Sequence, residues 1–226
     1  NNTDRIENYP GYKNIGGTDL TMKMMEQVQG FGGEIKTSTE VKSLTRREDG
    51  LIEISTSKET YTAKVVILTP GSSYRHLGVP GEEEFRQAGA GVSYCGTCDA
   101  PFFKDTVVVS VGGGNTAVEE TLHLAKYAKK VYMVHRRQEF RATKVLVEEL
   151  MEYVNQPDSN VELILDSVLE EITGEKSVER AVVKNVKTDE LRDITCDGVF
   201  IFAGMVPNTK FMEDFVDLTE HGFIQC

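Results

Sequence analysis

Residues 106–117 read Thr-Val-Val-Val-Ser-Val-Gly-Gly-Gly-Asn-Thr-Ala, an apolar run followed by a glycine-rich turn. The run predicts a buried strand over 106–111, and the sequence after the turn predicts a helix from Asn115 to about Tyr127. Glycines at such a turn allow the backbone to approach a pyrophosphate, and the helix start offers unpaired N–H groups to an anion. The alternative is a tight strand-to-helix turn without a ligand. The candidate nucleotide-binding residues are Gly112, Gly114, Asn115, Thr116, Ala117 and Glu119.

Glu119 has two interpretations of equal weight. It could contact the amide group of a nicotinamide, or it could simply favour the helix start through the helix dipole.

The sequence after this turn continues the alternation of strands and helices. A strand is expected over 130–134, a helix over 144–154, and further strands over 161–165, 178–186 and 194–202. A strand, a helix and a strand in succession form a βαβ unit. The second half of the chain is therefore expected to be an α/β domain with a parallel, doubly wound sheet.

A basic cluster follows the strand expected over 130–134. His135, Arg136 and Arg137 come directly after it, and Arg141 is close behind. A site that prefers NAD usually has an acidic residue here, which binds the ribose hydroxyls. Guanidinium groups instead suit the 2′-phosphate of NADPH, because they form paired hydrogen bonds with anionic oxygens. A solvated basic helix start is the alternative. Coupled to the glycine turn, the cluster favours NADPH.

Cys95 and Cys98 enclose Gly96 and Thr97, and Asp99 follows directly. Two thiols at this spacing can close a small disulfide ring, or one can attack a partner's disulfide while the other resolves it. Asp99 could then move the proton that thiol chemistry requires. Half of a zinc site and a pair of inert thiols are the alternatives.

The first part of the chain lacks a glycine fingerprint of its own. The expected elements there are a helix from Thr18 or Asp19 to about Gln29, a short strand over 34–37, hairpin strands over 41–45 and 51–55, and a buried strand over 64–68. Segments rich in Gly and Pro at 76–81 and 204–208 are candidate linkers between domains. A last strand is expected to begin at Phe223.

Composition excludes several classes of protein. The net charge of −11 argues against a nucleic-acid-binding surface, which gains affinity by neutralising phosphates. No apolar run approaches the length of about 20 residues that a membrane span needs, and the N-terminus has no signal-peptide pattern. Four cysteines in 226 residues do not make a disulfide scaffold. We therefore expect a cytoplasmic protein with no nucleic-acid or membrane partner and no metal.

Several motifs together resemble the low-molecular-weight, bacterial-type thioredoxin reductases, which are class II members of the pyridine nucleotide-disulfide oxidoreductases. They cover nearly the whole chain and are Ile6–Gly11 (Ile-Glu-Asn-Tyr-Pro-Gly), Cys95–Asp99 (Cys-Gly-Thr-Cys-Asp), Gly112–Glu120, His135–Arg137 with Phe140–Ala142, and Gly204–Thr209 (Gly-Met-Val-Pro-Asn-Thr). The resemblance implies a two-domain α/β protein with a Rossmann-like NADPH domain inserted into an FAD-binding domain. The expected boundaries are 1–76 for the first part of the FAD-binding domain, 77–204 for the NADPH-binding domain and 205–226 for the return segment.

The resemblance also implies the chemistry. Electrons would pass from NADPH to FAD, then to a Cys95–Cys98 disulfide, and then to the disulfide of thioredoxin. Cys98 would face the flavin, Cys95 would attack thioredoxin, and Asp99 would act as acid and base. Asn8 would contact FAD. Family members are homodimers in which one domain rotates against the other, and the two linkers are where a hinge is expected.

The sequence departs from the family in the FAD-binding domain. The N-terminal strand with its glycine fingerprint and the C-terminal Gly-Asp segment are absent, and Thr69-Pro70-Gly71 stands in place of Ala-Thr-Gly. We therefore expect an FAD-binding domain truncated at both ends that binds FAD poorly or not at all. The alternatives are the flavoprotein reductase of a peroxiredoxin system, a ferredoxin-fed flavin reductase, which would leave the arginines without a purpose, and a non-catalytic NADP-binding module.

Overall fold

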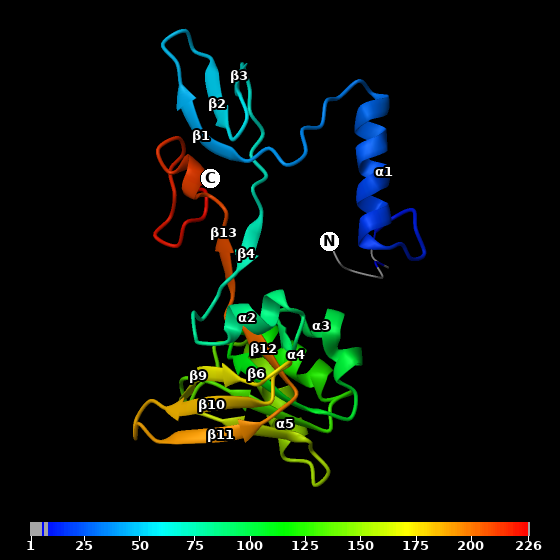
Figure 1. Cartoon of the computed structure of the whole chain (residues 1–226), viewed down its shortest axis with the longest axis vertical. Coiled ribbons are helices and arrows are strands. Elements are labelled where there is room, and N and C mark those ends of the chain that lie inside the picture. The colour runs from blue at the N-terminus through cyan, green and yellow to red at the C-terminus, as the bar shows by residue number, and fades with distance from the viewer. Residues whose placement is uncertain (1–5, 7–8, 226) are drawn as a thin grey trace. The chain divides into compact units, whose positions relative to one another are not determined.

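The computed structural model describes residue 6 and residues 9–225. The chain divides into two compact units (Figure 1). Unit 1 contains Asn1–Ser73 and Val206–Cys226, and unit 2 contains Tyr74–Met205. Unit 2 is therefore inserted between the two segments of unit 1. The boundaries expected from the resemblance lie after residues 76 and 204, and the two compact units change after residues 73 and 205.

A five-stranded parallel sheet forms the centre of unit 2, as the alternation of strands and helices predicts. In spatial order its strands are β5 (Val92–Ser93), β12 (Gly198–Phe202), β6 (Val107–Gly112), β7 (Lys130–Val134) and β8 (Val161–Ile164). The chain builds outward from β6 through β7 to β8, and β12 then lies on the other side of β6. The strand order thus reverses between β6 and β12.

Both faces of this sheet are covered. One face packs against η1 (Ala100–Phe103), α4 (Asn115–Leu124) and α5 (Lys144–Val154), and Val108 of β6 is fully buried there. The other face packs against α2 (Glu82–Gln87) and an antiparallel sheet, and Val109 is fully buried on that side. Because successive residues of a strand point to opposite faces, a strand covered on both sides reads as the continuous apolar run seen at 107–109.

The antiparallel sheet was not expected from the sequence. It consists of β9 (Ser167–Thr173), β10 (Arg180–Asn185) and β11 (Leu191–Thr195), in the order β11-β10-β9. The single strand predicted over 194–202 is wrong, because the chain turns at Cys196 and Asp197 and forms β11 and β12 in two different sheets. The Asp197 carboxylate accepts a hydrogen bond from the Val107 N–H at 2.9 Å, which holds this turn beside the start of β6.

Unit 1 contains α1 (Gly17–Gly30) and an antiparallel sheet of β1 (Val41–Arg46), β2 (Ile52–Thr56) and β3 (Thr60–Ala63). Its small core joins Leu44 and Ile52 from the first segment to Met212 from η2 (Lys210–Met212) of the second. The hairpin predicted around Asp49-Gly50 is confirmed by the antiparallel pairing of β1 with β2.

Three predicted strands of unit 1 are wrong. Residues 34–37 form no strand, and near Phe223 there is only an isolated bridge between Leu218 and Ile224. Residues 64–68 form no strand either, and Val65 and Ile67 are 76% and 86% exposed. Their apolar character does not by itself produce a strand, because no described strand pairs with this segment. Two short strands, β4 (Ser72–Tyr74) and β13 (Met205–Pro207), pair with each other.

Candidate nucleotide and dithiol site of unit 2

The glycine-rich turn lies at the carboxyl end of β6, where the strand order of the parallel sheet reverses. Gly112 pairs with Phe202 of β12 and has a φ of +154°. A Cβ atom on Gly112 would lie 2.6 Å from the carbonyl oxygen of Phe202 and 2.7 Å from the Cβ atom of Ala117. Glycine and the fully buried Ala117 therefore let α4 pack directly against these strands. In open α/β sheets, ligands bind at such a reversal.

The next two glycines have different surroundings. A Cβ atom on Gly113 would lie 2.1 Å from the nearest atom of the His135 ring, whereas one on Gly114 would meet no atom of the surrounding described residues within 4 Å. Gly114 is the N-cap residue of α4, its φ of −93° is open to any residue, and no side chain caps the helix. Gly113 is thus required by the fold. The space at Gly114, beside unpaired N–H groups of a helix start, fits the phosphates of a dinucleotide.

His135 and the arginine loop (residues 136–141) follow β7. The His135 ring is buried and stacks on Phe140 with 5.0 Å between ring centres, and Nε2 lies 3.0 Å from the carbonyl oxygen of Glu139. Burial lowers the pKa of His135, and the neighbouring arginines add to that effect. The side chain therefore supports the loop as a neutral ring.

The three arginines of the loop face solvent. Arg136, Arg137 and Arg141 are exposed, and within residues 9–225 none of their guanidinium groups forms an ion pair. The backbone N–H of Arg141 donates to the carbonyl oxygen of Gly113 at 2.7 Å, which joins the loop to the glycine turn. Asn115 adds a second link, because its Oδ1 accepts the N–H of Thr143 at 2.8 Å. Sequence-predicted residues from two separate stretches thus meet at one edge of the sheet.

Cys95 and Cys98 form a disulfide with an S–S distance of 2.04 Å. Cys95 is the N-cap of the short helix α3 (Gly96–Asp99), Cys98 lies within this helix, and the Cys95 sulfur accepts a hydrogen bond from the Cys98 N–H at 3.2 Å. Cys98 is exposed and Cys95 is half-buried.

A carboxylate from the nucleotide-side helix holds this turn. Glu120 of α4 accepts the N–H of Thr97 at 2.7 Å and the Thr97 hydroxyl at 2.9 Å. A Cβ atom on Gly96 would lie 2.3 Å from Oε2 of Glu120, so only glycine leaves room for this contact. Sequence reasoning noted Glu120 in a motif but found no role for it, because the two partners are 23 residues apart in the chain.

Asp99 is half-buried and is held by a second residue that sequence reasoning missed. The hydroxyl of Ser93, at the end of β5, donates to Oδ2 of Asp99 at 2.6 Å and accepts the N–H of Cys95 at 3.0 Å. Ser93 therefore fixes the carboxylate beside the disulfide. A lone serine in a strand has no sequence signal that would have identified this role.

Among the described residues, no group of three or more His, Cys, Asp or Glu side chains could hold a metal ion. Cys196 is buried, and burial raises the pKa of its thiol to about 12, so it stays protonated and unreactive at neutral pH. Within the described part of the chain, no helix has the length and apolar character of a membrane span.

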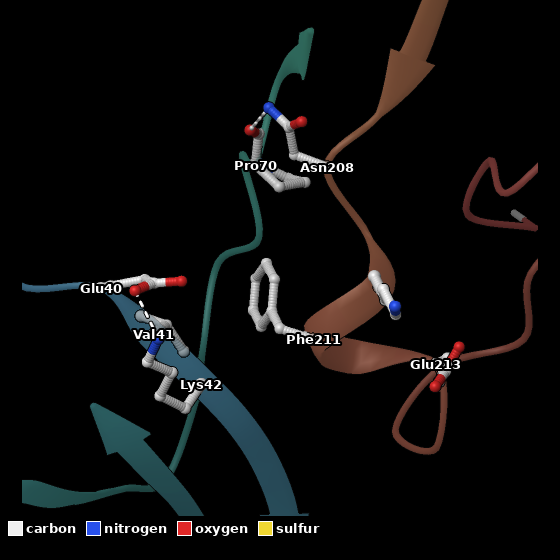
Figure 2. Close-up of a pocket in the computed structure, with 8 residues that line it drawn as sticks. Glu40, Val41, Lys42, Pro70, Asn208, Phe211 and Glu213 are labelled. Atoms are coloured by element: carbon white, nitrogen blue, oxygen red, sulfur yellow. Dashed lines mark hydrogen bonds and ion pairs between the residues drawn. The ribbon is translucent and has the colours of Figure 1, made fainter. Parts of the chain in front are cut away.

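Unit 1 has a pocket of about 690 Å³ between its two chain segments. Figure 2 shows that the ring of Phe211 lies along it, while the Asn208 side-chain amide donates to the Pro70 carbonyl at 3.2 Å and Lys42 pairs with Glu40. The lining mixes apolar and charged side chains of both signs. The FAD candidate Asn8 lies outside the described residues.

Comparisons with known proteins point in one direction. A family model described as pyridine nucleotide-disulphide oxidoreductase matches residues 2–226. The thioredoxin reductase of Treponema pallidum is 41% identical over 212 residues, which cover 93% of this chain and 66% of that protein. The thioredoxin reductase of Peptoclostridium acidaminophilum is 40% identical over 230 residues, which cover 98% of this chain and 70% of that protein.

Solved structures agree with the sequence relatives. The crystal structure of Lactococcus lactis thioredoxin reductase matches with a TM-score of 0.74 at 37% identity, covering 99% of this chain and 71% of that one. The Streptococcus pyogenes thioredoxin reductase structure matches with a TM-score of 0.67 at 41% identity, covering 99% and 71%. The chain thus spans about two thirds of the length of the curated relatives it matches.

Proposed function

This chain belongs to the pyridine nucleotide-disulphide oxidoreductases, and within them to the thioredoxin reductases. We propose that the protein uses NADPH to reduce the disulfide of a thioredoxin. The observation that carries this proposal is the placement of a disulfide and a nucleotide turn in one unit. Glu120, on the helix that begins at the glycine turn, binds Thr97, one of the two residues between the cysteines.

Unit 2 is the nucleotide-binding domain in this proposal. The glycine turn and the free N–H groups of α4 take the pyrophosphate, and the three arginines after His135 take the 2′-phosphate. The open space at Gly114 supports the first assignment, because no described residue fills it. The absence of ion pairs to these arginines within residues 9–225 supports the second. Thr116 and Glu119 are exposed at the start of α4, within reach of the same ligand.

The dithiol step uses residues of the same unit. The Cys95–Cys98 disulfide takes up two electrons and two protons and becomes a dithiol. The thiolate of Cys95 then attacks the thioredoxin disulfide and releases one thioredoxin thiol. Cys98 next attacks the mixed disulfide, which restores the Cys95–Cys98 bond and frees the second thiol. Asp99, fixed by the Ser93 hydroxyl at 2.6 Å, exchanges the protons.

Unit 1 is the FAD side of the protein in this proposal, with Asn8 as a flavin contact. The family binds FAD and NADPH. FAD, when bound, carries the electron pair between the nicotinamide and the disulfide. We further propose a homodimer, as the resemblance implies, and a cytoplasmic location, because a dithiol donor works where thiols are kept reduced.

An anaerobic visible spectrum tests this function directly. The purified chain is mixed with FAD, then with NADPH, and then with oxidised thioredoxin. Flavin that the chain retains is expected to bleach with NADPH and to recover with oxidised thioredoxin. Cys98→Ser should bind NADPH but fail to pass electrons to thioredoxin, whereas Cys196→Ala, at the buried thiol, should turn over normally. A Cys98→Ser protein that still reduces thioredoxin would exclude the proposed dithiol step.

A further inference from the structure

A buried carboxylate lies beside the arginine loop. Asp166 follows the end of β8, its side chain is 10% exposed, and its φ is +51°, a conformation that aspartate tolerates better than most residues. The carboxyl ends of β7 and β8 are neighbours in the parallel sheet, which brings Asp166 next to the loop that follows β7. No motif of the sequence indicated this residue.

Two side chains bind the same oxygen of Asp166. The Gln138 amide, from the arginine loop, donates to Oδ2, and the Lys187 ammonium, from the turn after β10, lies 2.6 Å from Oδ2. Both partners lower the pKa of the Asp166 carboxyl, with Lys187 the larger cause. Asp166 is therefore charged at neutral pH, and its charge is balanced by Lys187.

The backbone holds the same elements together. The N–H of His135 donates to the carbonyl of Ile164, and the N–H of Ser167 donates to the carbonyl of His135, both at 2.9 Å. The N–H of Val186 donates to the carbonyl of Asp166 at 2.7 Å. Strand β8, the base of the arginine loop and the turn that bears Lys187 thus form one connected support, with Asp166 at its centre.

The charge balance matters because of the loop's own arginines. A buried carboxylate without a partner would attract nearby guanidinium groups and repel a phosphate. Lys187 forms an ion pair with the Asp166 carboxylate. Within residues 9–225 the guanidinium groups of Arg136, Arg137 and Arg141 form no ion pair.

We propose that Gln138, Asp166 and Lys187 are positioning residues that fix the arginine loop and keep its guanidinium groups free for the 2′-phosphate of NADPH. This inference rests on the proposed function, because it assumes that the loop binds that phosphate. It adds that nucleotide preference is set partly by side chains that do not touch the nucleotide.

Isothermal titration of the chain with 2′,5′-ADP and with 5′-AMP separates the 2′-phosphate from the rest of the nucleotide. Gln138→Ala and Lys187→Met should each weaken 2′,5′-ADP binding by about 3- to 10-fold, the effect of one lost interaction. Binding of 5′-AMP should change by less than about twofold. Lys187→Arg keeps the charge and should restore the preference.

Lys184→Met is the matched control. It removes a lysine from the neighbouring strand that pairs with Asp189 at 2.8 Å and has no described link to the arginine loop. It should bind both probes as the parent chain does. Lys187 is 62% exposed, so its replacement leaves the fold intact, which thermal unfolding of each variant checks.

The remaining outcomes test the NADPH assignment and the positioning role separately. If the parent chain shows no preference for 2′,5′-ADP, both the NADPH assignment and this inference are wrong. If the parent prefers 2′,5′-ADP but Gln138→Ala and Lys187→Met keep the full preference, the inference alone is wrong. If both probes are weakened equally, the support holds the whole site rather than the 2′-phosphate, and the inference is again wrong.

Discussion

Adjacent glycines of the nucleotide turn should respond oppositely to the same substitution. Gly113 faces the His135 ring, and an added methyl group would lie 2.1 Å from it, whereas the same group on Gly114 would enter open space. Gly113→Ala is therefore expected to damage the fold, and Gly114→Ala is expected to damage only nucleotide binding.

The cost of Gly113→Ala follows from what His135 must give up. To make room, the ring has to leave its stack on Phe140 and its hydrogen bond to the carbonyl of Glu139. An aromatic pair and a hydrogen bond are each worth about 0.5–1.5 kcal/mol, so the free energy of unfolding should fall by about 1–3 kcal/mol. For a chain of this length, the melting temperature should fall by about 2–12 °C.

Gly114→Ala should leave stability almost unchanged. Alanine is a poorer N-cap than glycine, but it also restricts the unfolded chain, and the two effects offset each other to within about 1 kcal/mol. The methyl group would instead occupy the place where the backbone approaches the pyrophosphate. Affinity for 2′,5′-ADP should fall by at least about tenfold, the scale of losing a close phosphate contact.

Thermal unfolding by circular dichroism and calorimetric titration with 2′,5′-ADP measure the two effects separately. A Gly114→Ala protein that binds the nucleotide as the parent does would refute the phosphate site at this turn. A Gly113→Ala protein with an unchanged melting temperature would show that the ring contact does not constrain the fold.

Three further predictions concern the arginine pair, Glu120 and His135. Arg136→Ala combined with Arg137→Ala should raise the KM for NADPH by about tenfold or more and leave that for NADH nearly unchanged; equal losses in steady-state assays would exclude the 2′-phosphate role. Glu120→Ala removes both acceptors that bind the Cys-x-x-Cys turn and should slow disulfide turnover by about tenfold or more, because the sulfurs lose their fixed position. Glu120→Gln keeps one carbonyl acceptor and should be milder in rapid-reaction assays, and equal rates for both variants would contradict this role. Burial lowers the pKa of His135, so the unfolded chain takes up its proton first as the pH falls below about 6.5. The contribution of this group to stability is complete above that pH and is lost as the pH falls through the lowered value. In His135→Gln the melting temperature should therefore fall less steeply as the pH decreases below about 6.5. An unchanged dependence of melting temperature on pH would exclude the buried neutral ring.

The sequence by itself determined the elements whose signals are local. Strand β6, the turn at Gly112 and helix α4 were predictable, because hydrophobic period and glycine spacing are properties of neighbouring residues. The Cys95–Cys98 ring is local for the same reason, since three residues of chain hold the two sulfurs within bonding reach. The exposed arginines were likewise found from their position after a strand.

Tertiary structure decided the contacts between distant segments. The binding of Thr97 by Glu120 and the binding of Asp166 by both Lys187 and Gln138 depend on which elements pack together, and nothing near these partners in the chain signals it. The apolar run at 64–68 failed as a strand prediction for the same physical reason. A strand is completed by hydrogen bonds to a neighbour, and whether a neighbour exists is decided by the fold and not by the run itself.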